Sequence, residues 1–265
     1  MSPPKSLKIA LPLIIGLLLL AGYIVTHPVP TVLMFHSIDN DPPPDFPDVS
    51  PVRLKGFLDR IHRGGRITIT TDSSSSMIYS EFYPALRARG LTAIVFVLPL
   101  VVGTEGALTW GHVREMEQAG LTIGSHALTH PWLPDLTDEE IVCELCLSKT
   151  LIEQKLGHPI TDLAYPYGAF NQRIKEIARQ CGYSRAYVTA PGRRFSDQDP
   201  LAIKRVYVNE ATASNPVLAW LAVSDFFVTT RELALALLPI GVPRKPQDWS
   251  YEDWRQESGA VCRRG

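Results

Sequence analysis

Short apolar runs alternate with amphipathic stretches along most of the chain. Seven runs have the length and the apolar or β-branched character of buried strands, and they are Thr31–Phe35, Ile67–Thr71, Thr92–Leu98, Leu121–Gly124, Thr161–Tyr165, Arg185–Thr189 and Ile203–Val208. Five stretches between them have helical spacing: Leu54–Arg63, Met77–Arg89, Trp110–Ala119, Asp138–Leu156 and Asn171–Cys181. Because strands that alternate with helices form parallel βαβ units, this order predicts an α/β fold of the barrel type, with an open doubly wound sheet as the alternative.

The stretch Asp138–Leu156 is the clearest helix. Thr137 and Glu140 have the spacing of a capping box, and Gly157 is placed to end the helix. The same stretch contains Cys143 and Cys146, two of the chain's four cysteines. Since residues three apart share a helix face, we expect packed thiols here rather than a redox pair or half of a zinc site.

The N-terminal segment differs from the rest of the chain. No charged residue occurs from Ile9 to Val25, and Lys5 and Lys8 precede this run. A helix of that length would extend roughly 25 Å. The pattern predicts either an uncleaved membrane anchor at residues 9–25, after a short basic N-terminus (1–8), or a cleaved signal peptide. Both alternatives place the main domain outside the cytoplasm, membrane-anchored or secreted.

Residues 29–210 form the predicted domain, and residues 211–265 form a C-terminal extension. Within the domain, the loop Asp39–Pro51 has five prolines and four acids, so we expect it to be irregular and exposed. Helices are predicted at Pro216–Val223 and Arg231–Leu238 in the extension. The remaining end is expected to be irregular surface.

Composition limits the possible functions. The chain has 265 residues, of which 45% are hydrophobic and 20% charged, so it is long enough for one sizeable core and too highly charged for a polytopic membrane protein. With 26 basic against 27 acidic residues, the net charge of −1 predicts no nucleic-acid partner.

Titratable residues collect where the predicted strands end. His36 follows the first strand, Asp72 the second, His126 and His130 the fourth, and Tyr167 the fifth. In a barrel, the carboxyl ends of the strands form the active site, so these side chains are expected to converge. Two imidazoles four residues apart are able to share one metal ion, although two unrelated surface histidines are the alternative.

Asp72 is the only carboxylate in Thr68–Met77, and four serines follow it. It is interpreted either as a general base or metal ligand, or as an Asp that caps the next helix. His36 is a candidate general acid, or else a strand-end histidine bonded to a carbonyl.

These residues resemble the polysaccharide deacetylases of the NodB-homology class (carbohydrate esterase family 4), especially the branch that acts on poly-N-acetylglucosamine. The resemblance covers about residues 30–210, and its motifs follow the family's order. They are TVLMFHSI (31–38), ITITTDSSS (67–75), YSEFYPALRARGLTAIVFV (79–97), LTW (108–110), IGSHALTHPWL (123–133), ELCLSKTLIEQKLG (144–157), LAYPYGAFN (163–171) and IKRVYVN (203–209).

The resemblance implies an irregular (β/α)7-type, NodB-like barrel behind one N-terminal hydrophobic helix. It implies metal-dependent removal of N-acetyl groups from a cell-surface or secreted polysaccharide, with zinc as the expected ion and cobalt or nickel as alternatives. His126 and His130 match the metal ligands, and Asp72 matches the catalytic base. Tyr167 matches the residue whose backbone N–H holds the oxyanion, and His36 matches a general acid.

Several positions depart from the family pattern, and Ser73 and Ala164 are two of them. Ser73 stands where the family has a metal-binding aspartate, and Ala164 stands where many members have an arginine. A one-residue slip of the alignment would make Asp72 the metal ligand and leave no base. The sequence therefore supports two hypotheses: a deacetylase weakened by Ser73, or an inactive relative that binds glycans or assists a partner enzyme at the membrane.

Overall fold

The computed structural model describes residues 31–43, 48–61, 67–189, 199–224, 245–257 and 260–262. The predicted anchor at 9–25 and the predicted helix Arg231–Leu238 lie outside these residues. Within the described ranges, no helix is long and apolar enough to cross a bilayer.

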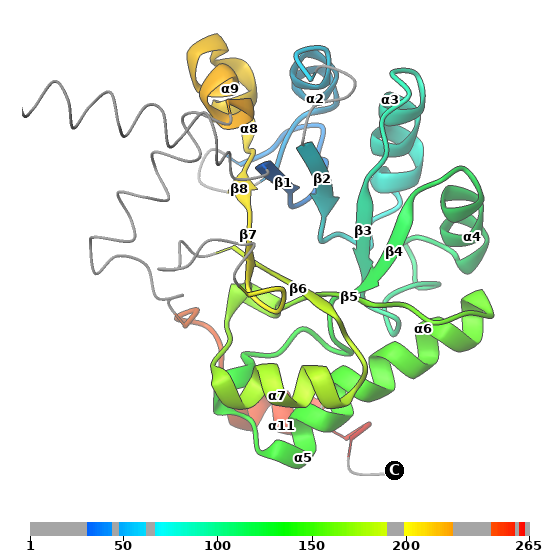
Figure 1. The fold of residues 1–265 in the computed structure, drawn as a ribbon, viewed down its shortest axis with the longest axis vertical. Helices are drawn as coiled ribbons and strands as arrows, with labels where there is room; N and C mark the ends of the chain where they lie inside the picture. Colours follow the sequence, from blue (N-terminus) through cyan, green and yellow to red (C-terminus); the bar gives the residue numbers. More distant parts are fainter. Residues whose placement is uncertain are drawn as a thin grey trace, which may run out of the picture.

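A parallel sheet curves into a nearly closed barrel at the centre of the molecule (Figure 1). Its strands are β1 (Thr31–Phe35), β2 (Ile67–Thr71), β3 (Ile94–Val97), β4 (Thr122–Ser125), β5 (Asp162–Ala164), β6 (Arg185–Val188), β7 (Ile203–Lys204) and β8 (Val206–Tyr207). They pair in the order β7-β6-β5-β4-β3-β2-β1-β8. The predicted barrel is confirmed.

The last predicted strand closes the barrel by changing partners at Arg205. Before Arg205, Ile203 and Lys204 pair with β6; after it, Val206 and Tyr207 pair with β1. The run Ile203–Val208 is therefore seen as two short strands, β7 and β8, and these are the two ends of the sheet order.

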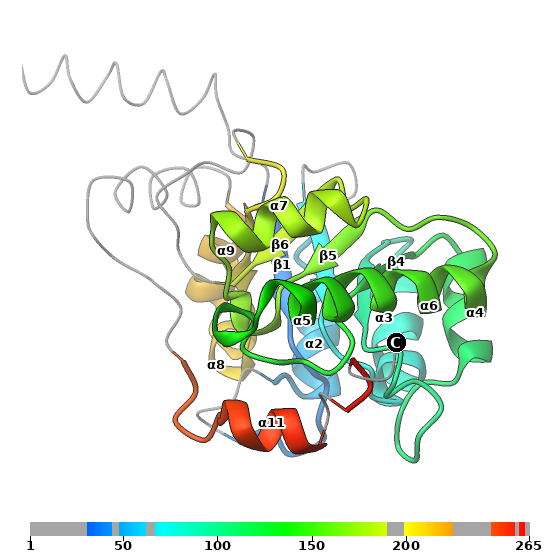
Figure 2. The same ribbon diagram turned by 90° about the horizontal axis from the view of Figure 1, so that it is seen from below.

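Helices surround the sheet. They are α2 (Pro51–Leu58), η1 (Ile78–Phe82), α3 (Tyr83–Arg87), α4 (Trp110–Gln118), α5 (Asp138–Val142), η3 (Cys143–Leu147), α6 (Ser148–Leu156), α7 (Gln172–Gln180), α8 (Glu210–Ser214) and α9 (Pro216–Val223), with 3-10 turns η2 (Leu133–Asp135) and η4 (Pro166–Gly168). The predicted capping box of Thr137 and Glu140 is present, and Gly157 ends α6 with φ 85°. Figure 2 shows a further helix, α11 (Tyr251–Glu257), apart from those that alternate with the strands.

Apolar side chains fill both sides of the sheet. Val32 belongs to a small cluster with Phe96 and Tyr187, whereas the next residue, Leu33, belongs to the main core. Because successive strand residues face opposite sides, the small cluster lies on one side of the sheet and the main core on the other. In the main core, the ring of Phe35 packs edge-on against those of Phe57 and Phe82, with centroids 5.7 and 5.6 Å apart.

Three expectations about the periphery were wrong. Cys143 and Cys146 are not packed thiols, because they form disulfides with Cys262 and Cys181. The C-terminal end contains α11 instead of being wholly irregular. The loop before α2 is not exposed throughout, since Asp48 and Val49 are buried.

Candidate active site

A pocket of about 620 Å³ opens beside the carboxyl ends of β1 and β2. Its lining includes His36, Ser37, Asp48, Asp72, Ser73 and His130. The parallel register brings Phe35, which precedes His36, opposite Thr71, which precedes Asp72. The pairing of β1 with β2 thus places the first histidine next to the acid, as the strand-end argument predicts.

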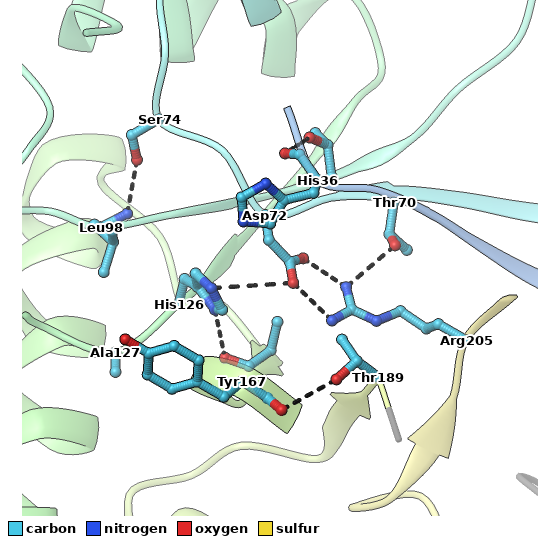
Figure 3. Close-up of polar contacts among 12 residues, drawn as sticks. His36, Thr70, Asp72, Ser74, Leu98, His126, Ala127, Tyr167, Thr189 and Arg205 are labelled. Atoms are coloured by element: carbon cyan, nitrogen blue, oxygen red, sulfur yellow. Dashed lines mark hydrogen bonds and ion pairs between the residues drawn. The ribbon is translucent and has the colours of Figure 1, made fainter. Parts of the chain in front are cut away.

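Asp72 is held by Arg205, which lies between β7 and β8. Its two carboxylate oxygens accept hydrogen bonds from Arg205 Nη1 and Nη2 at 2.5 and 2.7 Å (Figure 3). Both side chains are buried, and Arg205 also donates to Thr70 Oγ1. A bidentate pair fixes the orientation of the carboxylate as well as its charge.

Arg205 keeps Asp72 ionised despite its burial. Burial alone raises the pKa of a carboxyl group, but the charge and hydrogen bonds of the Arg205 guanidinium outweigh this effect, so the pKa of Asp72 lies below its ordinary value. Arg205 was not predicted from the sequence. The available signals were the absence of an arginine at Ala164 and the single arginine in an otherwise strand-like run.

His126 points one ring nitrogen toward Asp72. Its Nδ1 donates to the carbonyl oxygen of Ala164 at 2.8 Å, while its Nε2 lies 4.0 Å from Asp72 Oδ2 (Figure 3). A backbone carbonyl on Nδ1 fixes the tautomer that carries its free lone pair on Nε2. That arrangement suits an imidazole that binds a metal ion on the Nε2 side.

His130 lies against His126, as the spacing of the pair predicts. Their ring centroids are 4.7 Å apart, and the His130 ring also packs on that of Tyr167 at 4.5 Å. Burial lowers the pKa of His126 and lowers that of His130 to about 3. Both imidazoles are therefore neutral at pH 7, which is the form that binds metal ions.

Lowering the pH from 7 toward 4 is expected to lower the unfolding temperature of the metal-free protein. The pKa of His130 is about 3 in the fold against an ordinary value of 6.5, so the unfolded chain takes up a proton first as the pH falls. The contribution of neutral His130 to the stability of the fold is complete above about pH 6.5 and is lost progressively between pH 6.5 and 3. Thermal unfolding of His130→Gln should therefore depend less on pH than that of the wild type.

His158→Gln is the matched control for this titration. His158 is exposed, and its hydrogen bond with Glu117 raises its pKa. Its replacement should not reduce the pH dependence between 6.5 and 3. Parallel curves for wild type and His130→Gln would contradict the assignment.

Ser73 lies at the wall of the same pocket. Its Oγ accepts the N–H of Ser75 at 3.1 Å and lies 3.4 Å from Ser37 Oγ. Over the described parts of the chain, no group of three His, Cys, Asp or Glu side chains is arranged to hold a metal ion. The imidazole pair fits a divalent cation such as zinc, whereas the third, carboxylate ligand is missing.

The turn that carries Tyr167 is fixed by its neighbours. Tyr167 adopts the left-handed conformation, with φ 58°, and its carbonyl accepts the hydroxyl of Thr189 at 3.1 Å (Figure 3). Gly168 also has a positive φ, and a Cβ there would come within 2.2 Å of Thr189 Oγ1. Glycine is therefore required after Tyr167, and the backbone at the predicted oxyanion position is held in one conformation.

Among the described residues, the His36 ring bonds to a carboxylate and not to a carbonyl, which was the alternative to an acid role. Its Nδ1 lies 3.0 Å from Asp48 Oδ1, and its side chain is 36% exposed. A carboxylate on Nδ1 orients the ring and favours a proton on that nitrogen. All the predicted site residues thus lie around one end of the barrel, with Arg205 as an unpredicted addition.

A nearly closed parallel barrel with a buried acid, two neutral imidazoles and a fixed turn at its carboxyl end is an arrangement typical of (β/α) hydrolases. Residues 59–186 match the polysaccharide deacetylase family. This part of the chain is therefore a polysaccharide deacetylase domain of the NodB type.

Individual relatives agree with this assignment. YxkH of Bacillus subtilis is 30% identical over 155 residues, which are 58% of this chain and 56% of YxkH. The peptidoglycan-N-acetylglucosamine deacetylase PgdA of Listeria monocytogenes is 27% identical over 42% of this chain and 23% of its own. The chain thus spans about half or less of these curated relatives. The Streptococcus pyogenes deacetylase PplD shares the fold, with a TM-score of 0.65 at 21% identity over 73% of this chain and 99% of PplD.

Proposed function

We propose that this protein is a metal-dependent N-deacetylase of an N-acetylglucosamine-containing polysaccharide. The observation that carries the proposal is the approach of an ionised, buried Asp72 to within 4.0 Å of the Nε2 of a neutral His126. That spacing suits a carboxylate that acts as a general base and accepts a proton from a water held beside a metal ion. The relative PgdA, by its name, deacetylates N-acetylglucosamine in peptidoglycan.

Each residue of the site has a defined task in amide hydrolysis. Asp72 accepts a proton from the attacking water, whose oxygen bonds to the carbonyl carbon of the acetamide. The backbone N–H of Tyr167 donates to the oxygen that becomes negative. As the carbon–nitrogen bond breaks, His36 gives a proton to the amine nitrogen, and acetate leaves.

Arg205 and Asp48 support these steps without touching the substrate. Arg205 orients the Asp72 carboxylate and keeps it ionised, and Asp48 orients the His36 ring. His126 and His130 would hold the divalent ion, with zinc expected and cobalt or nickel as alternatives. When bound, the ion supplies Lewis-acid polarisation and lowers the pKa of water.

Ser73 predicts weak retention of this ion. Introducing a carboxylate with Ser73→Asp is expected to raise the affinity for zinc about 10- to 100-fold and to raise the rate of acetate release. Zinc dissociation constants and acetate release from N-acetylglucosamine oligomers measure both effects.

Ser75→Asp is the matched control, because it adds the same charge to the wall of the same pocket. Its zinc affinity should change much less than that of Ser73→Asp. Equal effects of the two substitutions would show that only net charge matters and would contradict the assignment of Ser73 to the ligand position.

A second function is favoured by the same serine. Without a third ligand, the domain would be inactive and would bind glycans or assist a partner enzyme. Purified wild-type protein that holds zinc and releases acetate supports the enzyme. Glycan binding with neither zinc nor acetate release supports the second function.

We also propose an extracytoplasmic location, membrane-anchored through residues 9–25 or secreted after cleavage. The two disulfides support it, because such bonds persist in oxidising compartments.

A further inference from the structure

The loop that carries both imidazoles has an unfavourable backbone conformation. Ala127 and His130 have φ values of 65° and 64°, in the left-handed region that side chains other than glycine rarely adopt. Such residues cost of order 1–3 kcal/mol each and persist only where their surroundings fix them. The conformation of residues 126–130, here called the imidazole loop, therefore depends on the groups that contact them.

Glu144 is the principal contact of this loop. It lies on η3 and is fully buried. Its Oε2 accepts the N–H groups of Leu128 and Thr129, each at 2.9 Å, and its Oε1 accepts the hydroxyl of Thr129 at 2.5 Å. One buried carboxylate thus binds three donors in the middle of the loop.

The C-terminal segment contacts Thr129 of the imidazole loop from outside the barrel. Trp254 of α11 is buried, and its Nε1 donates to Thr129 Oγ1 at 2.8 Å. The disulfide Cys143–Cys262 fastens the end of this segment to the residue before Glu144. Glu144 and Trp254 therefore meet at Thr129, and both are tied to η3.

We propose that Glu144 and Trp254 are positioning residues for the metal-binding imidazoles. They fix Leu128 and Thr129, the two residues between the left-handed Ala127 and His130, and so hold the conformation in which His126 and His130 converge. The inference rests on the proposed function in treating these imidazoles as metal ligands. It also assigns a role to α11 of the C-terminal extension, which contacts the imidazole loop through Trp254.

The test uses two substitutions, each with a matched control in the full chain. Trp254→Phe removes the hydrogen bond to Thr129, and Tyr251→Phe removes a comparable bond from the same helix to Glu140. Glu144→Gln weakens the contact with two loop amides, and Glu153→Gln alters a carboxylate that accepts the N–H of Ile160, outside the loop. Glu144→Ala, which removes every acceptor, completes the series.

Three readouts are measured on folded variants with similar unfolding temperatures. Hydrogen exchange of the amides of Leu128 and Thr129 reports on the loop without metal. Zinc affinity and the visible absorption of bound Co²⁺ report on the geometry of the imidazoles. We expect faster exchange, about 10-fold weaker zinc binding and an altered Co²⁺ spectrum in Trp254→Phe and Glu144→Gln, but not in the controls. Glu144→Ala should bind zinc more weakly still, so that the zinc affinity of Glu144→Gln lies between those of the wild type and Glu144→Ala.

Unchanged exchange and unchanged zinc affinity in Trp254→Phe and Glu144→Gln would overturn the inference. So would equal effects in Tyr251→Phe, because the residue would then act only by stabilising the extension. Wild-type protein that binds no zinc would contradict the proposed function, and hydrogen exchange would still decide whether these residues hold the loop. If Glu144→Ala does not fold, Trp254→Phe and its control decide the matter.

Discussion

Replacing Arg205 with methionine is expected to lower the free energy of unfolding at pH 7 by about 3–5 kcal/mol. Methionine fills much of the space but leaves the Asp72 carboxylate buried without its cation. Because burial then raises the pKa of Asp72 unopposed, the loss should shrink as the pH falls and the carboxylate takes up a proton. Urea denaturation at pH 7 and pH 5 measures both effects.

Two variants complete the experiment. Asp72→Asn combined with Arg205→Met removes both charges and should recover most of the lost stability. Arg179→Met is the surface control, because its partner Glu176 is also exposed, and it should cost less than about 1 kcal/mol. A loss for Arg205→Met no larger than that for Arg179→Met would contradict the importance of the buried pair.

Replacing Asp72 with asparagine is expected to reduce acetate release about 10²- to 10⁴-fold. The amide has nearly the shape of the carboxylate, but it does not accept the proton of the attacking water. The rate is best measured in the Ser73→Asp background, where the expected turnover of the parent is higher. Zinc affinity is measured alongside, since His126 and His130 remain.

The Asp72→Asn and Arg205→Met combination separates chemistry from stability. With both charges removed, this protein should fold nearly as well as the wild type and still release no acetate above the Asp72→Asn level. Retention of more than a tenth of the parent rate in Asp72→Asn would show that Asp72 is not the general base. A large loss of zinc affinity instead would support the shifted alignment, in which Asp72 is a metal ligand.

Much of the barrel follows from local sequence. The bounds of β1 and β2 were predicted without error, because each is a short run of apolar and β-branched residues that ends at a polar residue. The split of the last strand into β7 and β8 was not predicted. The strand with which a residue pairs depends on the curvature of the whole sheet. A local sequence pattern does not determine this curvature.

The residues of the site likewise divide into those that local sequence predicts and those that it does not. His36, Asp72, His126, His130 and Tyr167 were predicted because their positions after strands are local features. Arg205 was not, because its role depends on a partner 133 positions away. The wrong expectation for Cys143 has a similar origin: helical spacing identifies a shared face, but its disulfide partner lies 119 positions along the chain.

The position of Arg205 bears on how the protein is made. The carboxylate of Asp72 is synthesised long before its counter-ion, which arrives only with the residues that join β6 to β1. A nascent chain that has emerged only through β6 has neither a closed barrel nor a neutralised acid, so the end of β2 must stay hydrated until that point. Closure of the sheet and neutralisation of the buried acid thus depend on the same late segment of the chain, and neither is complete before Arg205 is in place.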